Sequence, residues 1–216
     1  MTKAILFDLD GTLLDTTEGL KCCVLWTANK MGFPLPSHEE IMSRFIGPPV
    51  QLSFGRYYGL DNVTAQRCAD VFRMRYQQPD VLFKATPYPG LFETLDALRT
   101  RGIRLGVATY KREDYAIKLL HHVGIDVYCS VAHGGDDLNK RTKSDIIRFC
   151  LDELGVAPQD AFLVGDTEHD AEGAMKAGMP FLGALYGFGF KSPADLSRFP
   201  HCGSVRMISQ ILEFVK

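Results

Sequence analysis

From residue 91 onward, short apolar runs alternate with longer segments that have helical spacing. The pattern predicts helices over 91–101, 112–123, 144–154, 168–177 and 205–214, and strands over 104–108, 128–132, 161–164 and 181–185. Strands that alternate with helices of about 10–15 residues are typical of a parallel sheet whose faces are covered by helices. We therefore expect an α/β protein with a doubly wound, Rossmann-like parallel sheet.

One more strand of this sheet is expected near the N-terminus, where residues 4–7 form an apolar run. A helical pattern follows over 13–32. Residues 37–84 then show only helical patterns, which are interrupted by a Gly-Pro-Pro break at 47–49; these patterns cover 39–45, 50–58 and 63–77. The sequence therefore predicts an α/β core domain formed by residues 1–14 and 86–216, with an all-helical cap domain inserted at 15–85.

The bulk composition excludes several classes of protein. With 216 residues, 46% hydrophobic and 23% charged, the chain has the composition of an ordinary globular protein. A net charge of -2 without a basic stripe gives no support to nucleic-acid binding. No run approaches the length of a membrane span, and the six cysteines are scattered without a CxxC pair. We expect a cytoplasmic protein with reduced thiols and no nucleic-acid or membrane partner, whose oligomeric state is open.

Two aspartates follow the first strand directly. Side chains two positions apart on a strand point to the same side, so Asp8 and Asp10 can converge at the carboxyl end of the strand, where ligands bind in open α/β sheets. Two close carboxylates need a cation or a shared proton, and oxygen ligands suit Mg²⁺. The plainer alternative is that Asp8 caps the strand and Asp10 with Gly11 forms a turn.

Polar side chains also follow two other predicted strands. Thr109 comes after the strand at 104–108, where its hydroxyl can donate to a phosphate oxygen or, alternatively, cap the next helix. Asp166 follows the strand at 161–164 and is preceded by Gly165, which allows a close backbone approach. Asp170 lies on the first turn of the helix predicted at 168–177, where an acidic side chain also interacts favourably with the helix dipole. His169, on the same turn, is expected at the surface.

A cation near this edge would offset the charge of the carboxylates. Lys140, Arg141 and Lys143 precede the helix predicted at 144–154. Lys143 is the better candidate because it stands at the start of that amphipathic helix, which fixes its position. Lys140 remains the alternative.

Taken together, these residues resemble the four motifs of the haloacid dehalogenase superfamily of phosphatases. The matching segments are FDLDGT at 7–12, VAT at 107–109, Lys143 and GDTEHD at 165–170. A helical insertion directly after the first motif is similar to the C1 cap subclass, and residues 45–54 and 185–189 look most like phosphoglycolate-phosphatase-like members. The chain departs from the family where prolines often follow the lysine, since Ser144 and Asp145 follow Lys143 here.

The resemblance implies a Mg²⁺-dependent phosphatase that hydrolyses a small phosphorylated metabolite through an aspartyl-phosphate. Asp8 would be the nucleophile and Asp10 the general acid and base. Mg²⁺ would be held by Asp8, the backbone carbonyl of Asp10 and Asp166, with Asp170 supporting the metal or orienting Lys143. Thr109 and Lys143 would bind the phosphoryl oxygens. In the insertion, Arg44 is our first choice for a residue that binds the rest of the substrate.

Other activities fit the same motifs. A phosphomutase acting on a sugar phosphate would keep all of them, and a nucleoside 5'-monophosphate phosphatase would differ only in its substrate. A dehalogenase is disfavoured, because it needs no metal and usually lacks the second aspartate. A binding protein on this fold would have no reason to keep a nucleophile, an acid/base group and metal ligands together. The sequence leaves the identity of the ester open.

Overall fold

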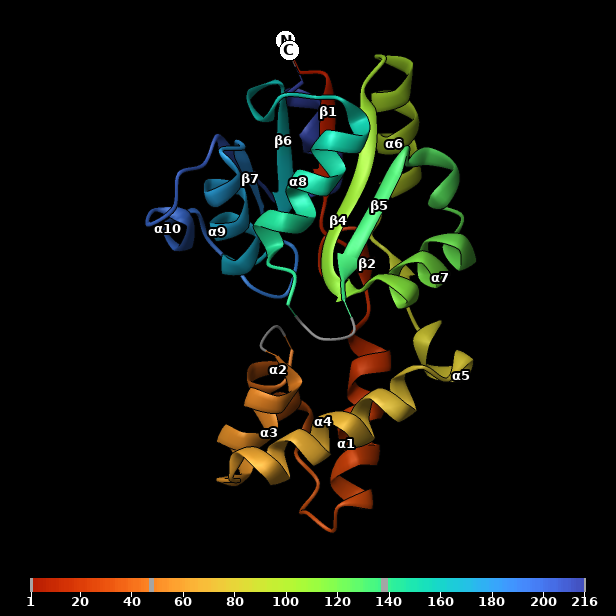
Figure 1. The fold of residues 1–216 in the computed structure, drawn as a ribbon, viewed down its shortest axis with the longest axis vertical. Helices are drawn as coiled ribbons and strands as arrows, with labels where there is room; N and C mark the ends of the chain where they lie inside the picture. The colour runs from red at the N-terminus through yellow and green to blue at the C-terminus, as the bar shows by residue number, and fades with distance from the viewer. Residues whose placement is uncertain (1, 47–48, 137–139, 216) are drawn as a thin grey trace. The chain divides into compact units, whose positions relative to one another are not determined.

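The computed structural model describes residues 2–46, 49–136 and 140–215 (Figure 1). The chain forms two compact units. One consists of Met1–Asp15 and Thr86–Lys216, and the other of Thr16–Ala85. Gly47 and Pro48, which belong to the break expected at 47–49, lie outside the described residues.

The first unit contains a six-stranded parallel sheet in the order β5-β4-β1-β6-β7-β8. The strands β1, β6 and β7 are buried along their whole length, which explains their apolar sequences. This sheet, with its flanking helices, confirms the predicted α/β class. The strand bounds are β1 Ala4–Phe7, β4 Arg104–Arg112, β5 Val131–Gly135, β6 Ala161–Gly165, β7 Phe181–Ala184 and β8 Gly203–Val205.

Helices α8 and α9 pack against each other and against the sheet, and Figure 1 shows α8 crossing in front of β4 and β6. Buried side chains of both helices join those of β1 and β6 in one hydrophobic core. The helices of this unit are α6 Leu91–Thr100, α7 Glu113–Val123, α8 Lys143–Leu154, α9 Glu168–Ala177 and α10 Pro193–Leu196, with short 3₁₀ helices at Asp126–Tyr128, Pro158–Asp160 and Ile208–Glu213.

The start of α8 is fixed by a capping box. The Thr142 side chain accepts a hydrogen bond from Asp145 N, and the Asp145 carboxylate accepts one from Thr142 N. Since both end groups are satisfied in this arrangement, Lys143 is held as the first residue of the helix.

Several predicted elements differ from the structure. The helix expected from residue 13 begins later, because β2 (Leu14–Asp15) pairs antiparallel with β3 (Thr86–Pro87). The strand expected at 128–132 begins at Val131, since a 3₁₀ turn precedes it. The helix expected at 205–214 is wrong: that segment holds the end of β8 and a 3₁₀ helix. Its buried Ile208 and Ile211 are three residues apart, which suits a 3₁₀ helix equally well.

In the second unit, the described residues form helices joined by loops, without a strand. In it, α1 packs against α4 and α5, and α3 packs against α4. Phe45, Phe54, Tyr57 and Tyr58 form an aromatic cluster in which ring centroids lie 4.7–6.0 Å apart. None of the helices in the described ranges is both long and apolar enough to cross a lipid bilayer. The bounds are α1 Thr17–Lys30, α2 His38–Arg44, α3 Val50–Tyr58, α4 Asn62–Tyr76 and α5 Pro79–Leu82.

Candidate active site

The register of the three central strands brings the predicted site residues to one edge of the sheet. Phe7 on β1 is level with Val107 on β4 and with Val164 on β6. Asp8 therefore lies directly beyond this level, and its backbone N donates to Val164 O at 2.9 Å. Thr109 on β4 and Asp166 after β6 each lie two positions beyond this level, at the same edge, as expected from parallel strands.

Lys143 reaches two of the aspartates. Its Nζ lies 2.8 Å from Asp8 Oδ1 and 2.6 Å from Asp170 Oδ1, and its side chain is only 2% exposed. The alkyl chain passes over Gly173 of α9, where any Cβ would overlap it. Although burial favours the neutral amine, the carboxylates of Asp170 and Asp8 raise the pKa of Lys143 above its ordinary value. The ammonium group is therefore a fixed positive charge.

Lys140 takes a different place. Its backbone N donates to Asp136 Oδ1 at 2.8 Å, and the residue is exposed. Of the two lysines weighed from the sequence, the structure brings Lys143 to the aspartates.

Asp166 is completely buried and held by three donors. Its Oδ1 accepts a hydrogen bond from Thr12 Oγ1 at 3.1 Å, and its Oδ2 accepts from Phe188 N at 2.6 Å and Gly189 N at 3.2 Å. The segment around Gly189, near the C-terminal end of the chain, thus contacts Asp166 through its backbone. These contacts were not predicted from the sequence. Tyr186 adds a second tie, since its hydroxyl donates to Thr12 O at 2.9 Å.

Glycines make this close approach possible. A Cβ at Gly11, Gly187 or Gly189 would overlap atoms of Asp166. Gly11 also has a φ of +82°, in the region that side chains disfavour. A Cβ at Gly165 would likewise overlap atoms of Asp170. The turn at Asp10 and Gly11 is therefore part of the site's construction as well as a chain reversal.

Three buried carboxylates form a cluster that suits a metal ion. One oxygen each of Asp8, Asp166 and Asp170 lies within 4.8 Å of the others. Burial raises the pKa of Asp8 to about 6, and burial together with the charges of Asp170 and Asp8 raises the pKa of Asp166 to about 8. A divalent cation bound between these carboxylates would favour their ionised forms. Mg²⁺ prefers oxygen ligands of this kind.

These two raised pKa values predict a falling stability of the metal-free protein with rising pH. The folded protein keeps protons on Asp8 and Asp166 that the unfolded chain has already lost above its ordinary value of 3.8. Their contribution to stability is full below that value and is lost as the pH rises through 6 and 8. In EDTA we expect the Tm to fall between about pH 5 and pH 8.5, and Mg²⁺ to raise it most at the alkaline end.

Asp166→Asn is the control for this measurement, because asparagine does not titrate. The variant should lose less Tm over the same range than the wild type. Equal slopes for both proteins would show that Asp166 does not titrate as described.

Asp10 lies outside the three-carboxylate cluster and has a lysine of its own. Lys111 Nζ donates to Asp10 Oδ1 at 3.0 Å and to Oδ2 at 2.7 Å, and the Lys111 side chain is 5% exposed. Sequence reasoning missed Lys111. The signal was present, since Lys111 follows Thr109 by two positions and side chains at that spacing on a strand share a face.

Thr109 is buried at the same edge. Its Oγ1 accepts a hydrogen bond from Lys111 N at 3.1 Å. The alternative that Thr109 caps the following helix is wrong, because α7 begins at Glu113 and its N-cap is Arg112.

Asp170 contacts both the start of its own helix and Lys143. Its Oδ2 accepts hydrogen bonds from Thr167 N and Thr167 Oγ1 at 3.0 and 2.7 Å, which caps α9, while its Oδ1 binds Lys143. His169 is exposed on the same turn, as expected. Arg44 is the last residue of α2 in the other unit, where it is exposed, and its function stays a prediction.

Comparison with known proteins gives a consistent result. Residues 5–184 match the family described as haloacid dehalogenase-like hydrolase. The chain is 33% identical over 211 residues to a 5'-nucleotidase of Pseudomonas aeruginosa, with 97% of this chain and 95% of the relative covered. It is 36% identical over 207 residues to a phosphoglycolate phosphatase of Rhodospirillum rubrum, with 91% and 85% covered. A solved haloacid dehalogenase-like family hydrolase from Streptococcus pneumoniae superposes with a TM-score of 0.90 at 26% identity, with 100% and 99% covered.

Proposed function

The chain belongs to the haloacid dehalogenase-like hydrolase family, and on this premise we propose that it is a Mg²⁺-dependent phosphatase that hydrolyses a small phosphate monoester through an aspartyl-phosphate intermediate. The observation that carries the proposal is the contact of Lys143 with Asp8 beside a buried carboxylate cluster. Relatives named phosphoglycolate phosphatase and 5'-nucleotidase support it.

In the proposed first step, an oxygen of Asp8 attacks the phosphorus atom. A bond forms between Asp8 and phosphorus, the bond to the ester oxygen breaks, and Asp10, which must carry a proton when this step begins, gives that proton to the departing alkoxide. Water then attacks the aspartyl-phosphate, and Asp10 takes a proton from this water. Phosphate leaves, and Asp8 is restored as a carboxylate.

Two lysine side chains hold Asp8 and Asp10 in place. Lys143 keeps Asp8 in a fixed orientation, and Lys111 holds both carboxylate oxygens of Asp10. Thr109 and Lys143 would bind the phosphoryl oxygens at the same edge. In such reactions the transition state is stabilised mainly by positive groups that already lie where its negative charge develops.

The proposed metal ligands are Asp8, the backbone carbonyl of Asp10 and Asp166, with Asp170 in support. When bound, Mg²⁺ supplies positive charge that offsets the repulsion between the Asp8 carboxylate and the phosphate dianion. Each pair of like unit charges 4 Å apart costs about 4 kcal/mol at an effective dielectric constant near 20. A phosphate ester with a charge of about -2 needs such an offset before Asp8 can approach it.

Two substrate classes stand first. Phosphoglycolate is supported by the sequence resemblance and by the relative from Rhodospirillum rubrum. A nucleoside 5'-monophosphate is supported by the 5'-nucleotidase, whose alignment covers nearly the whole of both chains.

We also propose Arg44 as a residue that binds the leaving group, because a guanidinium suits a carboxylate. A cytoplasmic location is proposed as well, and the six free cysteine thiols support it.

Phosphate release from a panel of esters tests the proposal. The panel contains phosphoglycolate, nucleoside 5'-monophosphates and sugar phosphates, each with Mg²⁺ and with EDTA. We expect release with Mg²⁺ and its loss in EDTA, and a higher KM for the preferred ester in Arg44→Ala. Isomerised sugar phosphate without free phosphate would favour a mutase instead, and an unchanged KM for every ester would exclude Arg44.

A further inference from the structure

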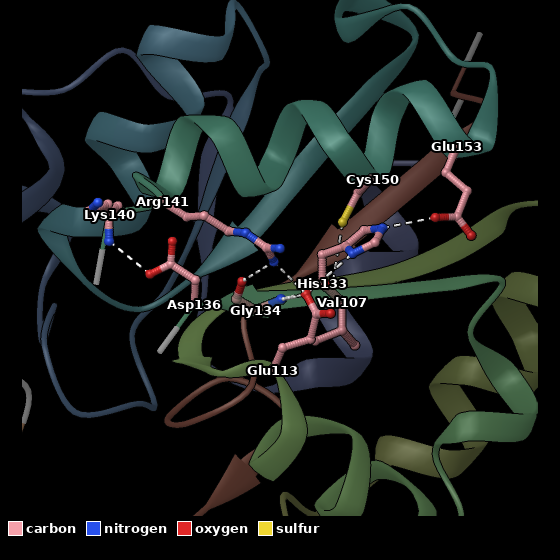
Figure 2. A network of polar contacts seen from close by, with 9 residues as sticks. All are labelled: Val107, Glu113, His133, Gly134, Asp136, Lys140, Arg141, Cys150 and Glu153. Carbon is pink, nitrogen blue, oxygen red and sulfur yellow. Dashed lines mark hydrogen bonds and ion pairs between the residues drawn. The ribbon is translucent and has the colours of Figure 1, made fainter. Parts of the chain in front are cut away.

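A network of polar contacts joins the ends of β4 and β5 to the segment before α8 (Figure 2). At its centre, Glu113 Oε2 accepts hydrogen bonds from Gly134 N at 3.0 Å and from Arg141 Nη1 at 2.8 Å. Arg141 Nη1 also donates to Gly134 O at 3.2 Å, and His133 Nδ1 lies 3.4 Å from Glu113 Oε2. One carboxylate thus ties together the start of α7, the end of β5 and the segment before α8.

Two of these segments carry the lysines of the active site. Glu113 follows Lys111, which holds Asp10, by two residues. Arg141 precedes Lys143, which holds Asp8, by two residues. The ion pair between Glu113 and Arg141 therefore connects the chain segments that place the two cations.

The pairing of β4 with β5 is irregular near Glu113. The register between β4 and β5 shifts between Ala108 and Arg112, so the regular ladder is interrupted where β4 carries Thr109 and Lys111. A Cβ at Gly134 would lie 2.5 Å from Lys111 O and 2.7 Å from Glu113 Cα, closer than side chains permit. The contacts of Glu113 hold this irregular strand end against β5.

We propose that Glu113, through Arg141, is a positioning residue that sets the places of Lys111 and Lys143 relative to Asp8 and Asp10. This inference rests on the proposed phosphatase function. The two side chains are 33% and 36% exposed, and an ion pair as exposed as this one contributes little to stability. A displacement of about 1 Å in a catalytic group, by contrast, lowers the rate by up to about 100-fold. The network should therefore affect kcat much more than stability.

Glu113→Gln tests the inference, with Glu153→Gln as a matched control. Glu153 faces the other side of the same imidazole, with its Oε2 2.8 Å from His133 Nε2 (Figure 2). Both variants remove one negative charge beside His133, but Glu153 lies on α8 beyond Lys143, with no described contact to either lysine segment. We expect kcat to fall about tenfold or more in Glu113→Gln and to stay within about twofold in Glu153→Gln, with small Tm changes in both.

Two further measurements separate positioning from a merely structural role. Arg141→Met should lower kcat as Glu113→Gln does, and the double variant should be no slower than either single variant, because both remove one connection. Inhibition by orthovanadate, a mimic of the transition state, should weaken by the same factor as kcat, while inhibition by phosphate changes less than about threefold. If Glu113→Gln fails to fold, Arg141→Met carries the test.

A wild-type kcat in Glu113→Gln, or an equal fall in Glu153→Gln, would overturn the inference alone. A wild type that releases no phosphate from any ester would overturn the phosphatase proposal and this inference with it.

Discussion

Asp8→Asn is expected to lower kcat for phosphate release by at least about 10⁴-fold, since losing a nucleophile has effects of this order in other covalent enzymes. The amide nitrogen and oxygen of asparagine are poor nucleophiles, so no aspartyl-phosphate can form. The replacement has nearly the same shape, and its amide oxygen can still accept the hydrogen bond from Lys143. The loss should therefore come from chemistry and not from unfolding, which phosphate release and a Tm measured together will show.

Asp15→Asn is the matched control. Asp15 lies in the same N-terminal segment but is exposed at the end of β2. Its replacement should leave kcat within about twofold, as surface substitutions generally do. Activity of Asp8→Asn within tenfold of the wild type would exclude Asp8 as the nucleophile.

Lys143→Met should have the second largest effect. Methionine fills similar space, but Asp8 and Asp170 lose the ammonium group that lies between them. Removing one partner of a buried ion pair costs about 3–5 kcal/mol of stability, and removing a donor from the transition state lowers kcat by about 10²–10³-fold. Tm and phosphate release, measured on the same preparation with Mg²⁺, test both effects.

The pH dependence sharpens this prediction. Burial raises the pKa of Asp8 to about 6 even though Lys143 lowers it, so without the ammonium group Asp8 takes up a proton more readily. The loss of stability should therefore be smaller at about pH 5 than at about pH 8. Lys140→Met removes an equal charge from an exposed residue three positions away and should change neither kcat nor Tm. A loss of activity in Lys140→Met with none in Lys143→Met would reverse the assignment.

Local patterns predicted much of the fold. The strand at 161–164 and the helix at 168–177 agree with the structure to within one residue, because a buried apolar run and a helix between Thr167 and Gly178 are both specified by neighbouring residues. β8 was missed because Gly203–Val205 has no apolar run of its own. It becomes a strand by pairing with β7, a contact that no local pattern contains.

The same distinction applies to the candidate site. Asp8 and Thr109 were found because they follow predicted strands directly, and Asp166 because it follows one after a single glycine. Lys111 was missed because the strand was expected to end at residue 108, whereas β4 continues to Arg112. The donors from Phe188 and Gly189 to Asp166 could not be predicted, since a backbone N–H has no signature in the sequence.

The hydrogen bonds from the 186–189 segment to Asp166 and Thr12 also affect the order in which the protein becomes functional during synthesis. The ribosome makes β1 first, but β1 lies between β4 and β6, which emerge much later. A nascent chain that ends before Tyr186 already contains Asp8, Lys143 and Asp166, yet it lacks two of the three donors that hold Asp166, the backbone N–H groups of Phe188 and Gly189. Catalytic turnover on the ribosome would therefore report that almost the whole chain has emerged and folded.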